Sequence, residues 1–415
     1  MSSHRPLAGL VATAAAAALV LAGCSSSSGG DDTLSVWLPP FAAEDAEVGD
    51  LELWNEIIAP FEEEHDVDVE VTIVPWENFE ERFLTGFSSG DGPDIGYMYA
   101  EMIGDYISRG QLSTFEVSDE QRETYYFTDL GIYEDDQYGL PIVVGGARVL
   151  YYNKAILDEV GVEAPQTWDD LVDASLAVQA AGHTPLVMPW GEPGVGVLAI
   201  NYINFLWQAG GEIISEDGTT AAFNTPEGLE AAQFVHDLRF EHEILTDGTT
   251  ATADADIIEQ FSTGEVAFAF GSDADAATYT DAGIDIGAVV LENAERATFV
   301  ATDVLVMAES SSNKELAEAL AWFLISGPSM DTFATIAAFP PISSEQTTEA
   351  NPMFADLYSV DADVLRQYPA VPNSANVYTS LYENLQQMML GSKTPEQALA
   401  DAEAAANESL SRNAE

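Results

Sequence analysis

Apolar and polar residues follow two recurring patterns along the N-terminal part of the chain. Val67–Val74 alternates apolar and polar residues as a half-buried strand does, and the apolar residues of Leu53–Glu64 recur at helical spacing. Leu34–Leu38 and Pro93–Tyr99 are predicted as two more strands, and Phe79–Phe87 as a second helix. The resulting order, β-α-β-α-β, predicts a mostly parallel sheet covered by helices.

The same patterns continue toward the C-terminus. The further predicted strands are Arg148–Tyr152, Leu186–Met188, Val266–Phe270 and Val300–Met307. The further predicted helices are Asn153–Val160, Trp168–Ala181, Ala199–Ala209, Thr225–His242, Lys314–Ile325, Met330–Ala337 and Val377–Leu390. Strands that alternate with helices place the chain in the α/β class, in which ligands bind at the carboxyl ends of the strands. The tryptophans inside these elements, Trp37, Trp168, Trp207 and Trp322, are predicted to lie in the core.

The first 32 residues follow neither pattern. A charged start at Arg5 precedes an apolar run from Leu7 to Ala22, and a polar stretch follows from Ser25 to Asp32. This arrangement is typical of a secretory signal, and the apolar run is short for a membrane helix, which needs roughly 20 residues. We predict a signal peptide at residues 1–23 and a flexible tether at residues 24–32.

The end of the apolar run carries a recognisable motif. Leu21-Ala22-Gly23-Cys24 resembles the lipobox of bacterial lipoproteins, in which the cysteine is lipidated and the chain is cut just before it. The resemblance implies that Cys24 anchors an exported protein to the outer face of the cytoplasmic membrane. Cys24 is the only cysteine, so the mature chain has no thiol left for a disulfide, a zinc site or a nucleophile.

Charge and length narrow the classes of function. The chain holds 12 basic and 71 acidic residues, a formal net charge of −59 at pH 7. This charge argues against nucleic-acid binding, because phosphate contacts need Lys and Arg. The excess of acidic residues is compatible both with adaptation to high salt, where charges are screened, and with the ordinary acidity of an acid-rich proteome. A length of 415 residues exceeds the usual single domain, so two domains are predicted, and we expect a monomer.

Aromatic and acidic residues gather near the ends of predicted strands. They are Tyr97, Tyr99, Glu101, Trp190, Glu192 and Asp273, to which we add Asp303 in a late strand and Tyr378 in a late helix. A sugar offers C–H faces that flat rings can cover and hydroxyls that carboxylates can accept. Trp190 lies in a loop between Pro189 and Pro193, which favours exposure to a cleft. The pattern favours a carbohydrate site, with no cofactor and no metal.

Six short motifs occur in order along residues 33–410. They are Gly92–Ile95, Tyr138–Pro141, Tyr152–Lys154, Pro165–Asp169, Phe261–Glu265 and Gly391–Leu399. Together they resemble the bacterial extracellular solute-binding family that contains the maltose- and multiple-sugar-binding proteins. The resemblance implies a two-lobe periplasmic-binding-protein-like fold with a ligand cleft between the lobes and hinge crossings. The lobes would comprise residues 33–143 plus 289–340, and residues 147–285 plus 345–415.

The resemblance also implies roles for particular residues and for partner proteins. Glu101 and Glu192 match acidic hydroxyl acceptors, Tyr378 matches a ring that stacks on the sugar, and Trp76 and Glu80 match the start of a helix that faces the cleft. The protein would be the substrate-binding subunit of an ABC importer. It would deliver a carbohydrate, most readily an oligosaccharide, to permease subunits that work with a separate ATPase.

Two departures from the best-known sugar site leave the ligand open. Asp273 stands where a maltose binder has a stacking tryptophan, and Gly145-Gly146 stands where it has a glutamate, with Arg148 close by. A polyol or a glycerol-phosphate ligand is one alternative, and Arg148 is then the candidate phosphate ligand. A surface-anchored glycoside hydrolase is the alternative from another class.

Overall fold

The computed structural model describes residues 33–42, 48–133, 135–337, 339–348 and 351–414. The predicted signal peptide, the tether and Cys24 therefore lie outside the described residues. None of the helices in the described part of the chain combines the length and the apolar character that a membrane span requires.

The first sheet is built mainly from the N-terminal part of the chain. Its strands are β1 (Thr33–Leu38), β2 (Asp68–Ile73), β3 (Ile95–Tyr99), β4 (Leu112–Ser113), β7 (Gly139–Gly145) and β13 (Ala301–Ala308). Their order is β2-β1-β3-β13-β4, and β7 also pairs with β13. β1 is parallel to β2 and β3, as the sequence predicted, whereas the late strand β13 runs antiparallel to its neighbours.

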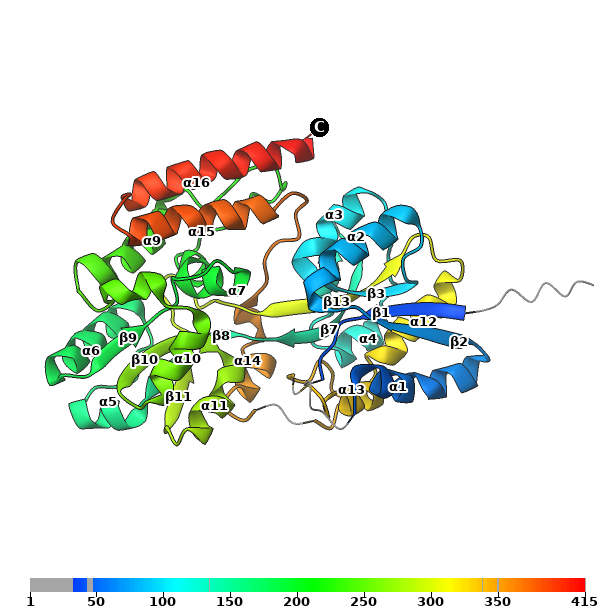
Figure 1. Cartoon of the computed structure of the whole chain (residues 1–415), viewed down its shortest axis with the longest axis horizontal. Helices are drawn as coiled ribbons and strands as arrows, with labels where there is room; N and C mark the ends of the chain where they lie inside the picture. Colours follow the sequence, from blue (N-terminus) through cyan, green and yellow to red (C-terminus); the bar gives the residue numbers. More distant parts are fainter. Residues whose placement is uncertain (1–32, 43–47, 134, 338, 349–350, 415) are drawn as a thin grey trace, which may run out of the picture. The chain divides into compact units, whose positions relative to one another are not determined.

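Helices cover both faces of this sheet (Figure 1). They are α1 (Asp50–His65), α2 (Phe79–Ser89), α3 (Ile103–Ser108), α4 (Asp119–Thr124), α12 (Lys314–Leu324) and α13 (Gly327–Phe333). Trp37 of β1 meets Phe83 of α2 edge to face, with ring centroids 5.4 Å apart. A side chain at Gly96 would come within 2.7 Å of the Phe83 ring, so glycine lets α2 lie close to β3. Trp54 of α1 stacks on Phe333 of α13 at 5.1 Å.

The second sheet has the strand order β11-β8-β10-β9. Its strands are β8 (Arg148–Asn153), β9 (Thr184–Val187), β10 (Val266–Ser272) and β11 (Ile286–Val289). The helices of this half are α5 (Lys154–Val160), α6 (Trp168–Ala181), α7 (Val195–Leu198), α8 (Asn204–Gln208), α9 (Pro226–Phe240), α10 (Asp254–Ser262), α11 (Ala276–Asp281), α15 (Ala375–Met389) and α16 (Pro395–Leu410). Thr167 caps α6 through a capping box with Asp170, a pairing that fixes where the helix begins.

Most predicted elements are present, and the differences have physical causes. The apolar helix predicted at 199–209 begins earlier, at Val195, and contains a π-helical segment, Ala199–Ile203, which hydrophobic periodicity does not reveal. The helix predicted at 330–337 is α13, which begins at Gly327 because Pro328 can occupy its first turn. Trp37, Trp168 and Trp207 are buried as predicted, whereas Trp322 is only partly buried.

Three chain segments pass between the two sheets and are bonded side by side (Figure 1). β7 continues into β8, β12 (Thr298–Phe299) continues into β13, and β14 (Leu365–Arg366) leads toward α15. β12 pairs in parallel with β14, and β7 pairs antiparallel with β13. The N–H of Val300 donates to the carbonyl oxygen of Arg366 at 2.8 Å. The remaining elements are the short helix α14 (Ala355–Ser359) and a hairpin formed by β5 (Ile132–Tyr133) and β6 (Asp136–Gln137).

Buried side chains reinforce the backbone pairing of these segments. The Thr298 hydroxyl donates to the carbonyl oxygen of Arg148 and accepts a hydrogen bond from Asn204 Nδ2 at 3.2 Å. Asn204 Oδ1 in turn accepts the N–H of Phe299 at 2.8 Å. Thr298 and Asn204 are both buried, so water cannot replace these bonds.

We expect Thr298→Val to lower the free energy of unfolding by about 1–3 kcal/mol, because Asn204 Nδ2 and the Arg148 carbonyl oxygen each lose their bond to the Thr298 hydroxyl. Chemical denaturation measures this change. Thr280→Val is the matched control, because the exposed Thr280 hydroxyl bonds only to carbonyls of its own helix. Equal destabilisation by the two substitutions would contradict the role assigned to Thr298.

Candidate functional site

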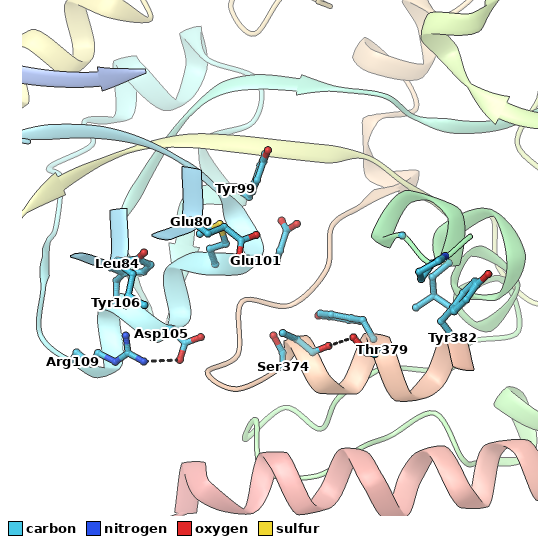
Figure 2. Close-up of a pocket in the computed structure, with 16 residues that line it drawn as sticks. Glu80, Leu84, Tyr99, Glu101, Asp105, Tyr106, Arg109, Ser374, Thr379 and Tyr382 are labelled. Atoms are coloured by element: carbon cyan, nitrogen blue, oxygen red, sulfur yellow. Dashed lines mark hydrogen bonds and ion pairs between the residues drawn. The ribbon is translucent and has the colours of Figure 1, made fainter. Parts of the chain in front are cut away.

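A cavity of about 650 Å³ lies between elements of the first sheet and elements of the second. One wall comes from α2, the end of β3, the 3₁₀ turn η2 (Ala100–Met102) and α3, and the other from the loop before α7 and from α15 (Figure 2). The first wall consists of Glu80, Leu84, Tyr99, Glu101, Met102, Asp105, Tyr106 and Arg109. The second wall consists of Pro193, Gly194, Leu198, Ser374, Ala375, Tyr378, Thr379 and Tyr382.

The structure brings four of the predicted site residues into this cavity: Glu80, Tyr99, Glu101 and Tyr378. Tyr99 is the last residue of β3, and Glu101 lies in the turn that follows. This is the carboxyl end of a central strand, where ligands of open α/β sheets bind. Tyr378 faces them from α15, with its hydroxyl donating to the Pro369 carbonyl oxygen at 3.2 Å. Sequence positions almost 280 apart thus share one site.

Trp76 does not line the cavity but supports a residue that does. Its ring is 40% exposed and lies parallel to the Tyr99 ring, with centroids 5.8 Å apart and an interplanar angle of 9°. Its indole N–H donates to the Pro40 carbonyl oxygen at 2.9 Å, which fixes the ring orientation. Trp76 and Tyr99 therefore form a stacked pair of rings, of which Tyr99 lines the cavity.

Tyr97, which is buried, and Asp303, which is partly buried, form a pair behind the cavity wall. Tyr97 and Tyr99 lie on one face of β3, and Asp303 of β13 is the register partner of Tyr99. The Tyr97 hydroxyl donates to Asp303 Oδ2 at 2.5 Å. Burial raises the pKa of Asp303 to about 7, with a smaller contribution from the charge of Glu101, although the Tyr97 bond opposes the rise. Neither Tyr97 nor Asp303 lines the cavity.

Glu101 is a charged group of the cavity wall that forms no ion pair within the described residues. Burial raises the pKa of its carboxyl group, and the negative charge of Glu80 adds to the rise, while a contact with the backbone of Glu101 itself lowers it. Burial is the main cause that raises the pKa of Tyr99 and of Tyr378, which lie on the two walls, and the negative charge of Glu101 raises both pKa values further. In Figure 2 the carboxylate points from η2 toward the space between the walls.

Arg148 and Asp273 lie at the crossing segments and do not line the cavity. The Tyr358 hydroxyl donates to Asp273 Oδ2 at 2.5 Å and accepts the N–H of Ala147 at 3.2 Å. Burial raises the pKa of Asp273, against the lowering effects of Tyr358, Ser272 and Arg148. These contacts join α14 to the chain between β7 and β8.

The exposure predicted for Trp190 is wrong. Its ring is fully buried beside Tyr382, with centroids 6.5 Å apart, and its carbonyl oxygen accepts hydrogen bonds from Tyr382 and Gln386, each at 3.0 Å. These hydrogen bonds hold the loop against α15. The prolines that flank Trp190 in the sequence gave no indication of this contact. Glu192 accepts the Asp254 N–H at 3.0 Å and lies outside the cavity lining, although the next residues, Pro193 and Gly194, line it.

Sequence reasoning missed several lining residues that a helical repeat could have indicated. Tyr382 lies one turn beyond Tyr378 on α15, and Asp105 and Arg109 follow Glu101 at intervals of four residues. Tyr106 of α3 gave no comparable signal. Within the described part of the chain, no group of three or more His, Cys, Asp or Glu side chains is arranged to hold a metal ion.

The cavity therefore combines ring faces on both walls with carboxylate acceptors on the first wall. Four tyrosines, Tyr99, Tyr106, Tyr378 and Tyr382, supply the flat surfaces, and Glu80, Glu101 and Asp105 supply the charges. Such a lining suits a ligand with apolar faces and many donor groups.

Comparisons with known proteins agree with this geometry. The model of the family described as bacterial extracellular solute-binding protein matches residues 45–328. A protein from Brucella abortus (strain 2308), named only as a binding protein, is 25% identical over 384 residues, covering 86% of this chain and 90% of that protein. The galactooligosaccharide-binding protein of Bacillus subtilis (strain 168) is 25% identical over 364 residues, covering 83% of each chain.

A solved structure extends the comparison to the fold. The crystal structure of a cyclic alpha-maltosyl-1,6-maltose binding protein from Arthrobacter globiformis matches with a TM-score of 0.73 and 20% identity, covering 92% of this chain and 100% of that chain. The likeness confirms the predicted two-lobe α/β fold.

The raised pKa of Asp303 leads us to expect that the stability of the fold depends on pH. Burial lifts its pKa from an ordinary 3.8 to about 7, so between these values the folded chain holds a proton that the unfolded chain releases. Its contribution is therefore most favourable at low pH and is lost as the pH rises through this window. Relative to Asp303→Asn, wild-type stability should fall by at most about 1.4 kcal/mol per pH unit across the window.

Urea denaturation between pH 4 and pH 8 measures this difference. Asp158→Asn, at an exposed position of α5, is the matched control and should track the wild type. If the free energies of unfolding of the wild type and of Asp303→Asn differ by the same amount at every pH, Asp303 carries no such proton.

Proposed function

Because the chain belongs to the bacterial extracellular solute-binding protein family, we propose that it is the substrate-binding subunit of an ABC importer and captures a carbohydrate in the cavity between its two sheets. The cavity carries this proposal, since tyrosine rings on two walls from different sheets face each other across it and three carboxylates line one of those walls. The named ligands of the relatives, a galactooligosaccharide and a cyclic maltosyl-maltose, support the carbohydrate class.

Binding would couple to motion because the two walls belong to different lobes. The proposed lobes are residues 33–143 plus 289–340 and residues 147–285 plus 345–415, joined by the crossing segments. A ligand that contacts both Glu101 and Tyr378 interacts with both walls only when they are close, so it favours the closed arrangement. The closed form would then dock on the permease subunits.

The proposed role is binding without catalysis. Members of this family are binding proteins, which supports this role. A glycoside hydrolase would instead need two carboxyl groups placed on either side of the scissile bond. Recovery of an intact oligosaccharide after long incubation with the protein is the corresponding check. Release of reducing sugar would overturn the proposed role.

Titration calorimetry with a panel of oligosaccharides, polyols and glycerol phosphodiesters tests the ligand class. We expect at least one carbohydrate to bind, and Ala375→Trp to weaken that binding at least tenfold, because the new ring fills the space beside Tyr378. Ala375 is exposed in the cavity, so the larger side chain need not disturb the core.

Gln387→Trp is the control, since Gln387 is exposed on α15 but outside the cavity lining. It should bind as the wild type does. Binding of polyols or phosphodiesters without any carbohydrate would exclude the proposed ligand class, and unchanged affinity of Ala375→Trp would exclude the cavity as the site.

The membrane anchor is a separate part of the proposal and rests on the motif at Leu21–Cys24. We expect Cys24→Ser to abolish labelling with a fatty-acid probe in cells and to shift the exported protein from the membrane fraction to the soluble fraction. Ser28→Ala in the tether is the control and should remain membrane-bound. An anchored Cys24→Ser protein would contradict lipidation at this residue.

A further inference from the structure

The charges that line the cavity do not balance. Glu80, Glu101 and Asp105 are acidic, and Arg109 is the one basic residue of the lining. Arg109 Nη2 lies 3.6 Å from Asp105 Oδ1, so its charge is already directed to that carboxylate (Figure 2). Two carboxylates of the same wall, Glu80 and Glu101, are left without a basic partner in the cavity.

Glu101 has no compensating partner elsewhere in the described part of the chain. No hydrogen bond or ion pair joins its carboxylate to another residue there, and its backbone supplies the one contact. Of the two arginines in the crossing segments, Arg148 acts instead on Asp273 and Asp275, and Arg366 pairs with Glu212 at 2.7 Å. Behind the wall, Asp303 adds a third acidic group to the same neighbourhood.

Burial makes the unpaired carboxylate of Glu101 energetically costly. A partly buried carboxylate loses hydration, and without a cation or several donors it has nothing to replace it. Sugar hydroxyls can donate to it, but an ammonium group supplies three donors and the opposite charge together. The net charge of −59 removes any long-range cationic field that could serve the same purpose.

We propose that the cargo is an amino sugar, or a short oligosaccharide of one, whose protonated amine lies between Glu80 and Glu101 while its rings pack on Tyr99 and Tyr378. This inference rests on the proposed function and specifies its ligand. The same charges oppose uronic acids and phosphorylated or sulfated sugars, because each such ligand would place a second anion beside Glu101.

Matched oligosaccharides test the inference. Di- and trisaccharides of glucosamine, N-acetylglucosamine, glucose and glucuronic acid are compared at each available linkage, so that the compared members differ in one substituent. Calorimetry at neutral pH and low salt measures the affinities. The glucosamine member should bind at least tenfold more tightly than its acetylated and hydroxyl counterparts, and the glucuronic acid member should bind most weakly.

Charge-removing variants assign the effect to the cavity. Glu101→Gln should weaken glucosamine binding at least tenfold and change the affinity for the neutral members less than threefold. Glu80→Gln, at an exposed position, should act in the same direction and tests the inference even if Glu101→Gln folds poorly. Glu383→Gln is the control, because Glu383 is exposed on α15 and outside the cavity lining.

The outcomes separate this inference from the proposed function. If neutral oligosaccharides bind as tightly as glucosamine ones, or if Glu101→Gln weakens all ligands equally, the amine is excluded and the carbohydrate function stands. If no carbohydrate binds in this series or in the wider panel, both fail together.

Discussion

The hydrogen bonding between the three crossing segments is the constraint on which the rest of the structure depends. The Arg366 carbonyl oxygen accepts the N–H of Val300, and Thr298 joins Arg148 to Asn204, so the crossing segments are held together side by side. The segments lie side by side in Figure 1 and set where the ends of β3 and α15 face each other. A cavity with walls from two sheets requires such a joint, because each sheet alone presents only half of the lining.

Two tyrosine–carboxylate pairs accompany this joint. Tyr97 donates to Asp303 behind the cavity wall, and Tyr358 donates to Asp273 at the crossing segments, each at 2.5 Å. In both pairs burial raises the pKa of the carboxyl group, so both favour the protonated form more than an exposed aspartate does. One pair supports the wall beneath Glu101, and the other ties α14 to the chain between the sheets.

The chain uses its few basic residues locally. All three lysines form ion pairs with a carboxylate, at 2.6–2.9 Å, on the surface. Such exposed pairs add little stability. Three lysines can pair with only a few of the acidic residues, and the others repel one another. The cavity repeats this imbalance in a less hydrated setting, which is why its ligand, and not a protein side chain, is expected to compensate Glu101.

The sequence by itself determined the α/β class, most helices and strands, the export signal prediction and the family, because these depend on local periodicity, caps and short motifs. It also indicated Glu80, Tyr99, Glu101 and Tyr378, which follow strand ends or match family positions. Only the tertiary structure decided that Trp190 is buried and that Tyr97, Arg148, Asp273 and Asp303 lie outside the cavity lining. Those outcomes depend on bonds such as Tyr382 to Trp190 and Tyr358 to Asp273, which join residues 192 and 85 positions apart. No local pattern encodes which distant partner a buried polar group will meet.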